Sequence, residues 1–314
     1  MAESIPKVPT ATLGRTGLKS TKIGLGSGNW IAKNSDEDFI AIMQEAYRLG
    51  IRHLDTAPLY GQERFGRLLK QSDPPDDILV ITKVGSLMNE DRSAAIVDFD
   101  PDLVERTVEL DLEQLGMEHL PVVLLHDLEP QHINQIMGKG GTLERLRKLQ
   151  SQGIIGSIGI AAGKPEAVAT AVVSGEFDIV QSYHLYILLN RFATKRVFPA
   201  AREHNMGVIN VGPWGGNILA TGAVEGAKYG YRPASDEVLE EVRRMERECA
   251  DKGVSLPVAA LAFSLACDDI DVTVIGPASI EELREDVAAL NAPLTGRDLQ
   301  AMASEKDYDG KYGE

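Results

Sequence analysis

Four ionisable side chains that can move or hold protons follow buried, strand-like runs. Asp55 and Tyr60 occur in HLDTAPLYG (53–61), Lys83 in ITKVG (81–85), and His126 ends VVLLH (122–126). A phenol of ordinary pKa is a poor acid or base at neutral pH, but an adjacent ammonium favours the phenolate. We therefore predict that Lys83 lowers the pKa of Tyr60, that Asp55 holds Lys83 in place, and that His126 orients a substrate oxygen. This chemistry suits reversible hydride transfer between a hydroxyl and a carbonyl.

Each of these residues, taken alone, also fits an ordinary structural role. A lone aspartate or lysine at a strand end often forms an ion pair, a lone histidine a buried hydrogen bond, and a lone tyrosine a packing contact. Four such residues after three successive strand-like runs are harder to explain in this way, because burying ionisable groups without a function is costly.

Eight short, β-branched runs position these residues and are predicted to be strands. They are almost continuously apolar, which is typical of parallel strands covered on both faces. Eight strand–helix units predict an α/β fold, the closed (β/α)8 TIM barrel, whose active site lies at the carboxyl ends of the strands. The alternative is an open, doubly wound sheet, but the glycine spacing of GLGSGN (24–29) does not match a dinucleotide-binding turn. The predicted strands are 22–26, 52–56, 78–84, 121–126, 156–160, 178–183, 207–211 and 272–275.

Amphipathic segments between the strands are predicted to be helices. Ser35, Asp100, Thr194 and Ser235 stand where N-cap residues would satisfy free backbone N–H groups. Residues 11–21 are predicted to form an N-terminal β-hairpin that plugs the lower end of the barrel, and the chain 1–314 is predicted to be a single domain. The helices are predicted at 36–49, 63–70, 101–115, 142–152, 165–174, 194–204, 235–252 and 280–290, with extra helices at 257–266 and 295–304.

The composition restricts the class of function. Asp and Glu outnumber Lys and Arg, 47 to 32, and the formal net charge of −15 disfavours nonspecific binding to nucleic acid or to anionic membranes. The two cysteines, Cys249 and Cys267, form no pair or cluster, so a disulfide framework or a structural metal is not expected. The sequence shows neither a signal-peptide pattern nor a membrane-spanning apolar run. We expect a cytoplasmic enzyme or binding protein.

The segments HLDTAPLYG, ITKVG and VVLLHD, in this order, resemble the tetrad-bearing segments of the aldo-keto reductases. The likeness extends from LGRTGLKSTKIGLG (13–26) to IGPASIEELREDV (275–287). It implies an NAD(P)-dependent oxidoreductase that acts on CH–OH and C=O groups, with a catalytic tetrad of Asp55, Tyr60, Lys83 and His126.

The resemblance also implies where an extended dinucleotide would bind without a Rossmann motif. A glutamine in DIVQSY (178–183) matches the residue that contacts the nicotinamide carboxamide, and the glycines of NVGPWGGNILATG (210–222) would let backbone N–H groups approach the pyrophosphate. The N-terminus of the last barrel helix can receive a further phosphate. The expected cofactor-binding residues are Gln181, Gly212, Pro213, Trp214, Gly216, Gly276, Ala278, Ser279, Glu282, Glu285 and Asp286.

One position bears on the choice between NAD and NADP. Family members that favour NADP commonly carry arginine early in the last helix, where this chain has Glu282. A carboxylate would repel the 2′-phosphate and accept hydrogen bonds from a free ribose diol, so NAD is expected. Two alternatives stay open: Glu282 serves only the helix dipole, or the nearby Arg284 reaches a phosphate. The chain also departs from the family pattern at Ala161, Ala162, Val211 and Asp286.

Three aromatic residues and two segments bear on the choice of substrate. Trp30, Tyr186 and Trp214 are expected to line the mouth of the barrel, and they suit sugar faces and aromatic aldehydes alike. DIVQSYHLYILLNR (178–191) and GVINVGPWGGNIL (207–219) are most similar to the aldose dehydrogenase branch, which resembles L-galactose, D-threo-aldose and L-fucose dehydrogenases and pyridoxal 4-dehydrogenase. With NAD, the branch implies oxidation of an aldose at C1 to the lactone, with Tyr60 as the base.

The alternatives are an NADPH-dependent aldehyde or ketone reductase and a cofactor-binding regulatory subunit, like the potassium-channel β subunits. We expect a monomer or a small homo-oligomer.

Overall fold

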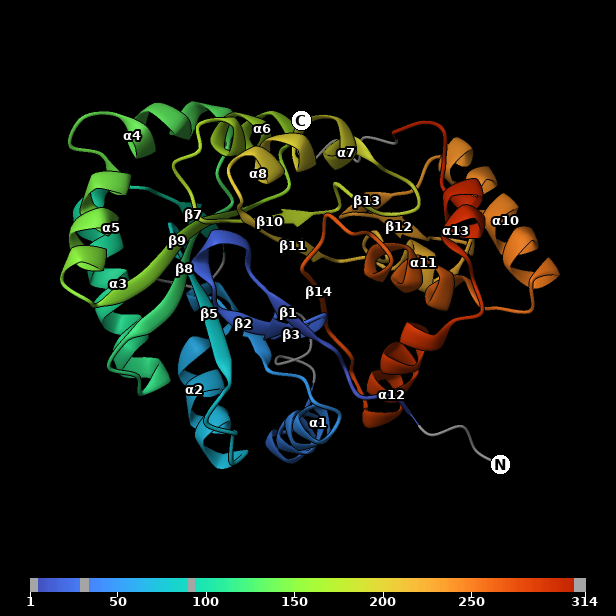
Figure 1. Cartoon of the computed structure of the whole chain (residues 1–314), viewed down its shortest axis with the longest axis horizontal. Helices are drawn as coiled ribbons and strands as arrows, with labels where there is room; N and C mark the ends of the chain where they lie inside the picture. The colour runs from blue at the N-terminus through green and yellow to red at the C-terminus, as the bar shows by residue number, and fades with distance from the viewer. Residues whose placement is uncertain (1–4, 29–33, 90–93, 308–314) are drawn as a thin grey trace.

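The predicted barrel is confirmed. A computed structural model of the protein describes residues 5–28, 34–89 and 94–307. Eight parallel strands close on themselves in the order β10-β11-β14-β3-β4-β5-β8-β9, and helices surround them (Figure 1). The barrel strands are β3 (Ile23–Gly26), β4 (His53–Asp55), β5 (Leu79–Val84), β8 (Leu120–His126), β9 (Ile155–Ala162), β10 (Ile179–Tyr183), β11 (Gly207–Val211) and β14 (Val272–Ile275).

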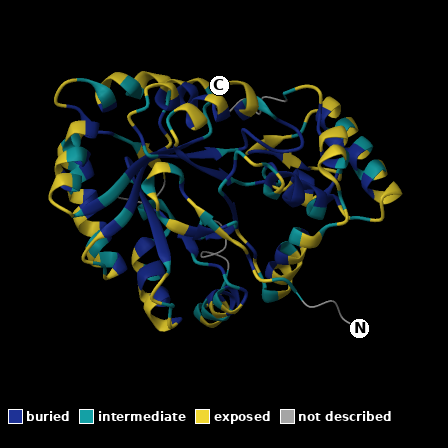
Figure 2. Ribbon diagram, in the orientation of Figure 1, coloured by how far each residue is buried: buried dark blue, intermediate teal, exposed yellow. Residues whose placement is uncertain are grey.

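The helices follow the strands in the alternation that the sequence predicts. Their inward faces are buried and their outward faces exposed, while the strands between them are buried almost throughout (Figure 2). Among the described residues, no helix has both the length and the apolar character that crossing a bilayer requires. The helices are α1 (Asp36–Arg48), α2 (Gln62–Gln71), α3 (Pro101–Leu115), α4 (Ile133–Met137), α5 (Thr142–Ser151), α6 (Pro165–Val173), α7 (Phe192–Arg196), α8 (Phe198–Glu203), α9 (Ile218–Thr221), α10 (Asp236–Asp251), α11 (Leu256–Leu265), α12 (Ile280–Ala288) and α13 (Gly296–Met302).

Three of the four predicted N-caps are present. Ser35 accepts a hydrogen bond from the Asp38 amide, Asp100 from two amides of α3, and Ser235 from the Val238 amide. The prediction was wrong for Thr194, which lies inside α7 and donates its hydroxyl to the Arg191 carbonyl.

The segment predicted as one helix at 194–204 is two short helices instead. α7 ends at Arg196 and α8 begins at Phe198, with Pro199 in the first turn of α8. Proline has no N–H to donate and its ring clashes with the preceding turn, so a single helix cannot continue through it.

The N-terminal hairpin plugs the barrel as predicted. β1 (Thr10–Thr12) pairs with β2 (Lys19–Thr21), and Leu13 between them is fully buried among inward-facing barrel residues. Leu13 packs against Gly207, the first residue of β11, which places the hairpin at the amino ends of the strands. The opposite, carboxyl end of the barrel is left for the site. Two further hairpins, which the sequence analysis missed, are β6 (Ser86–Met88) with β7 (Ala95–Val97) and β12 (Lys228–Tyr229) with β13 (Arg232–Pro233).

Candidate active site

A buried ion pair forms the floor of the site. Asp55 ends β4 and Lys83 lies in the neighbouring strand β5, and the Lys83 Nζ contacts Asp55 Oδ1 at 2.5 Å. The same ammonium donates to the Thr56 carbonyl at 3.0 Å. Lys83 is 1% exposed and Asp55 3% exposed, so neither charge reaches bulk water. A pair this deeply buried is held by its mutual contact, because either charge alone would be strongly destabilising there.

Tyr60 and His126 meet above this pair. Tyr60 lies in the single 3-10 turn Pro58–Tyr60 after β4, and His126 is the last residue of β8. The Tyr60 hydroxyl is 3.2 Å from His126 Nε2, a hydrogen bond whose donor depends on the histidine tautomer. The Lys83 Nζ lies 5.3 Å from the centroid of the Tyr60 ring. The structure therefore brings the four predicted catalytic residues together.

The expected acidification of Tyr60 by Lys83 is not what the structure shows, and that expectation needs correction. Burial raises the pKa of Tyr60 well above 10, and the nearby carboxylates of Asp55 and Asp127 raise it further. Because the Lys83 ammonium is engaged by Asp55, its charge is largely offset at the phenol. Tyr60 thus holds its proton at neutral pH. Burial and the Lys83 ammonium lower the pKa of His126 well below 6.5, so its ring is neutral there.

A cavity of about 260 Å³ opens at the carboxyl ends of the strands, directly above these residues. Asp55, Tyr60 and His126 line it, whereas Lys83 lies beneath Asp55 and outside the lining. A concave cavity on which several polar groups converge is the usual form of a small-molecule site.

Several residues that the sequence analysis missed also line the cavity. Asp127 and His184 both have left-handed backbone, with φ of 56° and 60°. The His184 ring stacks on that of Tyr183 at 3.6 Å between centroids, and Tyr231 lies 6.1 Å from Tyr183. Residue types alone do not reveal these roles, because left-handed backbone at a non-glycine residue depends on its surroundings.

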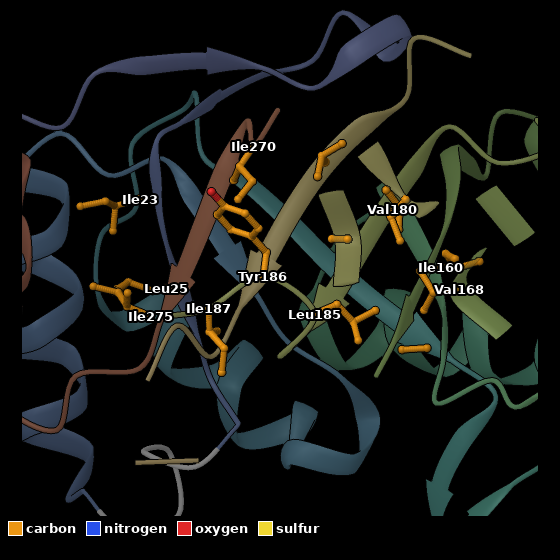
Figure 3. Close-up of a cluster of buried hydrophobic side chains, with 14 of the residues drawn as sticks. Ile23, Leu25, Ile160, Val168, Val180, Leu185, Tyr186, Ile187, Ile270 and Ile275 are labelled. Atoms are coloured by element: carbon orange, nitrogen blue, oxygen red, sulfur yellow. The ribbon is translucent and has the colours of Figure 1, made fainter. Parts of the chain in front are cut away.

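Of the three residues expected to contact the substrate, one lines the cavity, one lies in the core, and one lies outside the described residues. Trp214 lines the cavity, and its indole Nε1 donates to the Pro257 carbonyl at 3.1 Å. Tyr186 does not reach the cavity: it is 3% exposed and stacks on Phe263 at 4.6 Å, inside the core that Figure 3 shows around it. Its assignment to the substrate is therefore corrected. Trp30 lies outside the described residues.

Gln181 lines the cavity and, within the ranges that the structure describes, has a buried side-chain oxygen without a partner. It is 5% exposed, it lines the cavity from β10, and among the described residues its Oε1 has no hydrogen-bond partner. A buried acceptor without a donor is costly, so it fits a ligand that donates a hydrogen bond, such as a primary carboxamide. Ala161, Ala162 and Val211 line the same wall with small apolar side chains, which leaves room for a flat ring.

The loop after β11 passes over the cavity with unusual backbone. Gly212, Gly215 and Gly216 have φ of 70°, 61° and 72°, and Asn217 continues at 89°. A Cβ at Gly216 would lie 2.4 Å from the Gly230 carbonyl oxygen, so close packing requires glycine there. Gly212, Trp214 and Gly216 line the cavity, whereas Pro213 is buried outside the lining.

Two side chains at the start of α12 already accept hydrogen bonds from backbone N–H groups there. The Ser279 hydroxyl caps the Glu282 amide, and the Glu282 carboxylate accepts from the Ala278 amide at 2.7 Å. Of the residues expected here, only Gly276 lines the cavity. Arg284 is bound to Glu45 of α1 at 2.8 Å and so is held away from the start of the helix.

Three acidic residues lie close to one another on α12. The pKa of Asp286 is raised to about 8, first by burial and then by the carboxylates of Glu282 and Glu285. Asp286 therefore keeps its proton at neutral pH, and the carboxylates of Glu282 and Glu285 give this face of the helix a negative potential.

The comparisons with known proteins agree with this geometry. The Aldo/keto reductase family model matches residues 22–306. The chain is 30% identical over 296 residues to L-galactose dehydrogenase of Arabidopsis thaliana, covering 90% of this chain and 88% of that protein. It is 27% identical over 305 residues to D-threo-aldose 1-dehydrogenase of a Pseudomonas species, covering 88% and 92%. Among solved structures, it is similar to the holo form of an aldo-keto reductase from Bacillus halodurans, with a TM-score of 0.80, 25% identity and coverage of 96% and 99%.

The chain therefore belongs to the aldo/keto reductase family, and it is an NAD(P)-dependent oxidoreductase.

Proposed function

We propose that this enzyme transfers a hydride between NAD(H) and a sugar or aldehyde, and that its preferred reaction is the oxidation of an aldose at C1 to the lactone. The observation that carries the proposal is the hydrogen bond between Tyr60 and His126 above the buried Asp55–Lys83 pair, at the floor of the cavity. The likeness to aldose dehydrogenases supports the substrate class.

In this proposal each of the four residues has one role. Tyr60 exchanges the proton of the reacting oxygen, and the neutral His126 ring holds that oxygen by a hydrogen bond. Lys83 and Asp55 form the rigid, charged floor that keeps Tyr60 in position. When bound, the nicotinamide supplies or accepts the hydride.

The described residues fit a nicotinamide dinucleotide. The unpartnered Gln181 Oε1 would accept from the carboxamide, and the glycine backbone at Gly212 and Gly216 would lie against the pyrophosphate. In this proposal Gly276, which lines the cavity, and Ser279 at the start of α12 would lie beside the adenosine half.

The acidic face of α12 supports NAD over NADP. A 2′-phosphate placed here would meet the carboxylates of Glu282 and Glu285, whereas a free ribose diol can donate hydrogen bonds to them. Arg284, the alternative phosphate ligand, is already paired with Glu45. The Glu282 carboxylate also accepts from the Ala278 amide at the start of α12, so stabilising the helix end and binding a ribose diol are compatible roles.

One observation favours a second candidate, reduction of an aldehyde or ketone. A Tyr60 whose pKa lies well above 10 keeps its proton at neutral pH, so the protonated form that reduction needs is present and the phenolate that oxidation needs is scarce. An NADPH-dependent reductase would use it in that direction. A regulatory subunit without turnover is less well supported, because all four proton-handling residues are assembled.

Initial rates distinguish the two reactions. We expect turnover with NAD+ plus L-fucose or L-galactose, followed by nicotinamide absorbance, and slower turnover with NADP+. Activity confined to NADPH plus simple aldehydes would reject the dehydrogenase assignment. Undetectable turnover over a broad sugar and aldehyde panel would favour the regulatory subunit.

We also propose a cytoplasmic enzyme, since Cys249 and Cys267 are both free thiols, and a monomer or small homo-oligomer. Light scattering of the purified protein measures the oligomeric state.

A further inference from the structure

Asp127 places a carboxylate beside the reacting groups. It follows His126 directly, lines the cavity, and its side chain is 49% exposed. Its amide donates to the Ala161 carbonyl at 2.8 Å, which ties its backbone to β9, and its φ of 56° is left-handed. A left-handed turn could be formed by glycine or asparagine equally well, so the turn alone does not explain a carboxylate here.

The Asp127 carboxylate lies close to the His126 ring nitrogen that faces Tyr60. Asp127 Oδ2 lies 3.7 Å from His126 Nε2, the same atom that is 3.2 Å from the Tyr60 hydroxyl. A substrate oxygen held by Tyr60 and His126 would therefore bring the substituents of the adjacent carbon within reach of Asp127.

The Lys83 ammonium acts on the Asp127 carboxylate and lowers its pKa, but the two groups are not in contact. In the described part of the chain, its only contact at salt-bridge distance is with His126, whose ring is neutral. Burial raises the pKa of Asp127, and the neighbouring Ser86 hydroxyl lowers it. A half-exposed carboxylate at the cavity wall accepts hydrogen bonds from water when no ligand is present, and the hydroxyl groups of a ligand can take the place of that water.

We propose that Asp127 is a specificity-determining residue, which accepts a hydrogen bond from the hydroxyl next to the reacting carbon and so selects neutral, hydroxylated substrates. This deepens the proposed function and rests on it for the reacting oxygen. Substrates without that hydroxyl leave the carboxylate unpaired, and substrates with a carboxylate at that place are repelled.

The test compares substrates that differ only in hydroxyl groups. Propanal has the three-carbon chain of D-glyceraldehyde without its hydroxyls, and both are assayed by reduction with NADH. Asp127→Gly removes the carboxylate and tolerates the left-handed backbone, and Asp127→Asn removes only the charge. The control is Glu129→Gln, a carboxylate two residues further on that pairs with Lys164 and lies outside the cavity lining.

We expect Asp127→Gly to lower kcat/KM for D-glyceraldehyde by about 10- to 100-fold, mostly through KM, while the value for propanal changes by less than about threefold. Asp127→Asn should show a smaller loss with D-glyceraldehyde and faster turnover of glyoxylate, because it removes the repulsion. Glu129→Gln should leave all three substrates unaffected.

Equal losses for both aldehydes, or no loss for either, would overturn the inference. The predicted pattern without any oxidation of aldoses would support Asp127 as a selector of hydroxylated substrates and reject the aldose dehydrogenase assignment. A wild-type enzyme that reduces propanal but not D-glyceraldehyde would overturn the inference and leave the reductase alternative standing.

Discussion

The Asp55 carboxylate and the Lys83 ammonium lie 2.5 Å apart at the base of the cavity, and both are almost fully buried. The pair joins two neighbouring barrel strands, β4 and β5, directly beneath the turn that carries Tyr60. In the proposed mechanism the pair would position the phenol and set the local potential, rather than exchange protons with a substrate.

Removing one member of this pair should cost stability as well as activity. Lys83→Met leaves the Asp55 carboxylate buried without its partner, and we expect the free energy of unfolding to fall by about 3–5 kcal/mol. The double variant Lys83→Met, Asp55→Leu should recover most of that loss in denaturant unfolding but no turnover. A double variant as unstable as the single one would contradict the account of the pair.

The pH profile should follow the raised pKa of Tyr60. Because burial keeps the phenol protonated up to and above pH 10, aldehyde reduction should be flat from neutral pH to about 9, and oxidation should become faster across the same range. Neither direction should show a step near pH 6.5, because the pKa of His126 is lowered well below that value. A bell-shaped profile centred near neutrality would be inconsistent with both shifts.

A buried carboxyl group outside the cavity should make stability depend on pH. Asp111 of α3 accepts a hydrogen bond from Thr82 at 2.8 Å, and burial raises its pKa to about 8. The folded protein keeps this proton where the unfolded chain has lost it, so the stability due to Asp111 decreases as pH rises from about 4 to 8 and then levels off.

Asp111→Asn should remove that dependence, because the amide mimics the protonated acid. Its stability relative to the wild type should rise by roughly 1 kcal/mol per pH unit over that range, as measured by urea unfolding. A difference that does not change with pH would show that Asp111 is ionised in the folded protein.

Cofactor preference should respond to the acidic face of α12. Glu285→Gln removes one of the carboxylates there, and we expect KM for NADP+ to fall severalfold while KM for NAD+ changes little. Glu281→Gln is the matched control, since Glu281 is an exposed acid on the same helix that is not among the carboxylates raising the pKa of Asp286. Equal effects of the two substitutions on NADP+ would indicate only a general loss of charge.

Much of the barrel could be predicted from the sequence, for identifiable reasons. The strands β11 and β14 begin and end where the apolar runs do, and α3 begins at Pro101 behind the Asp100 cap. The residue types at each end determine where these elements begin and end, so the boundaries can be read from short stretches of sequence. The break between α7 and α8 was missed although Pro199 signals it. The prediction that the whole chain is one domain stays a prediction.

The site was predictable where it depends on strand order and not where it depends on backbone turns or packing. Strand ends in a barrel converge, so Asp55, Lys83 and His126 could be placed together from the sequence. Asp127 and His184 enter the cavity through left-handed backbone that sequence patterns do not reveal. Tyr186 was misplaced because an aromatic residue near the rim can equally stack into the core, as it does on Phe263.

The central claim is that Tyr60 supplies and removes the proton of the reacting oxygen. The most direct test is Tyr60→Phe, with kcat for aldehyde reduction and the affinity for NADH measured on the same preparation. We predict a fall in kcat of about 10²- to 10⁴-fold with NADH affinity nearly unchanged. A variant that keeps kcat within about threefold of the wild type would contradict the claim, since a phenyl ring cannot exchange a proton.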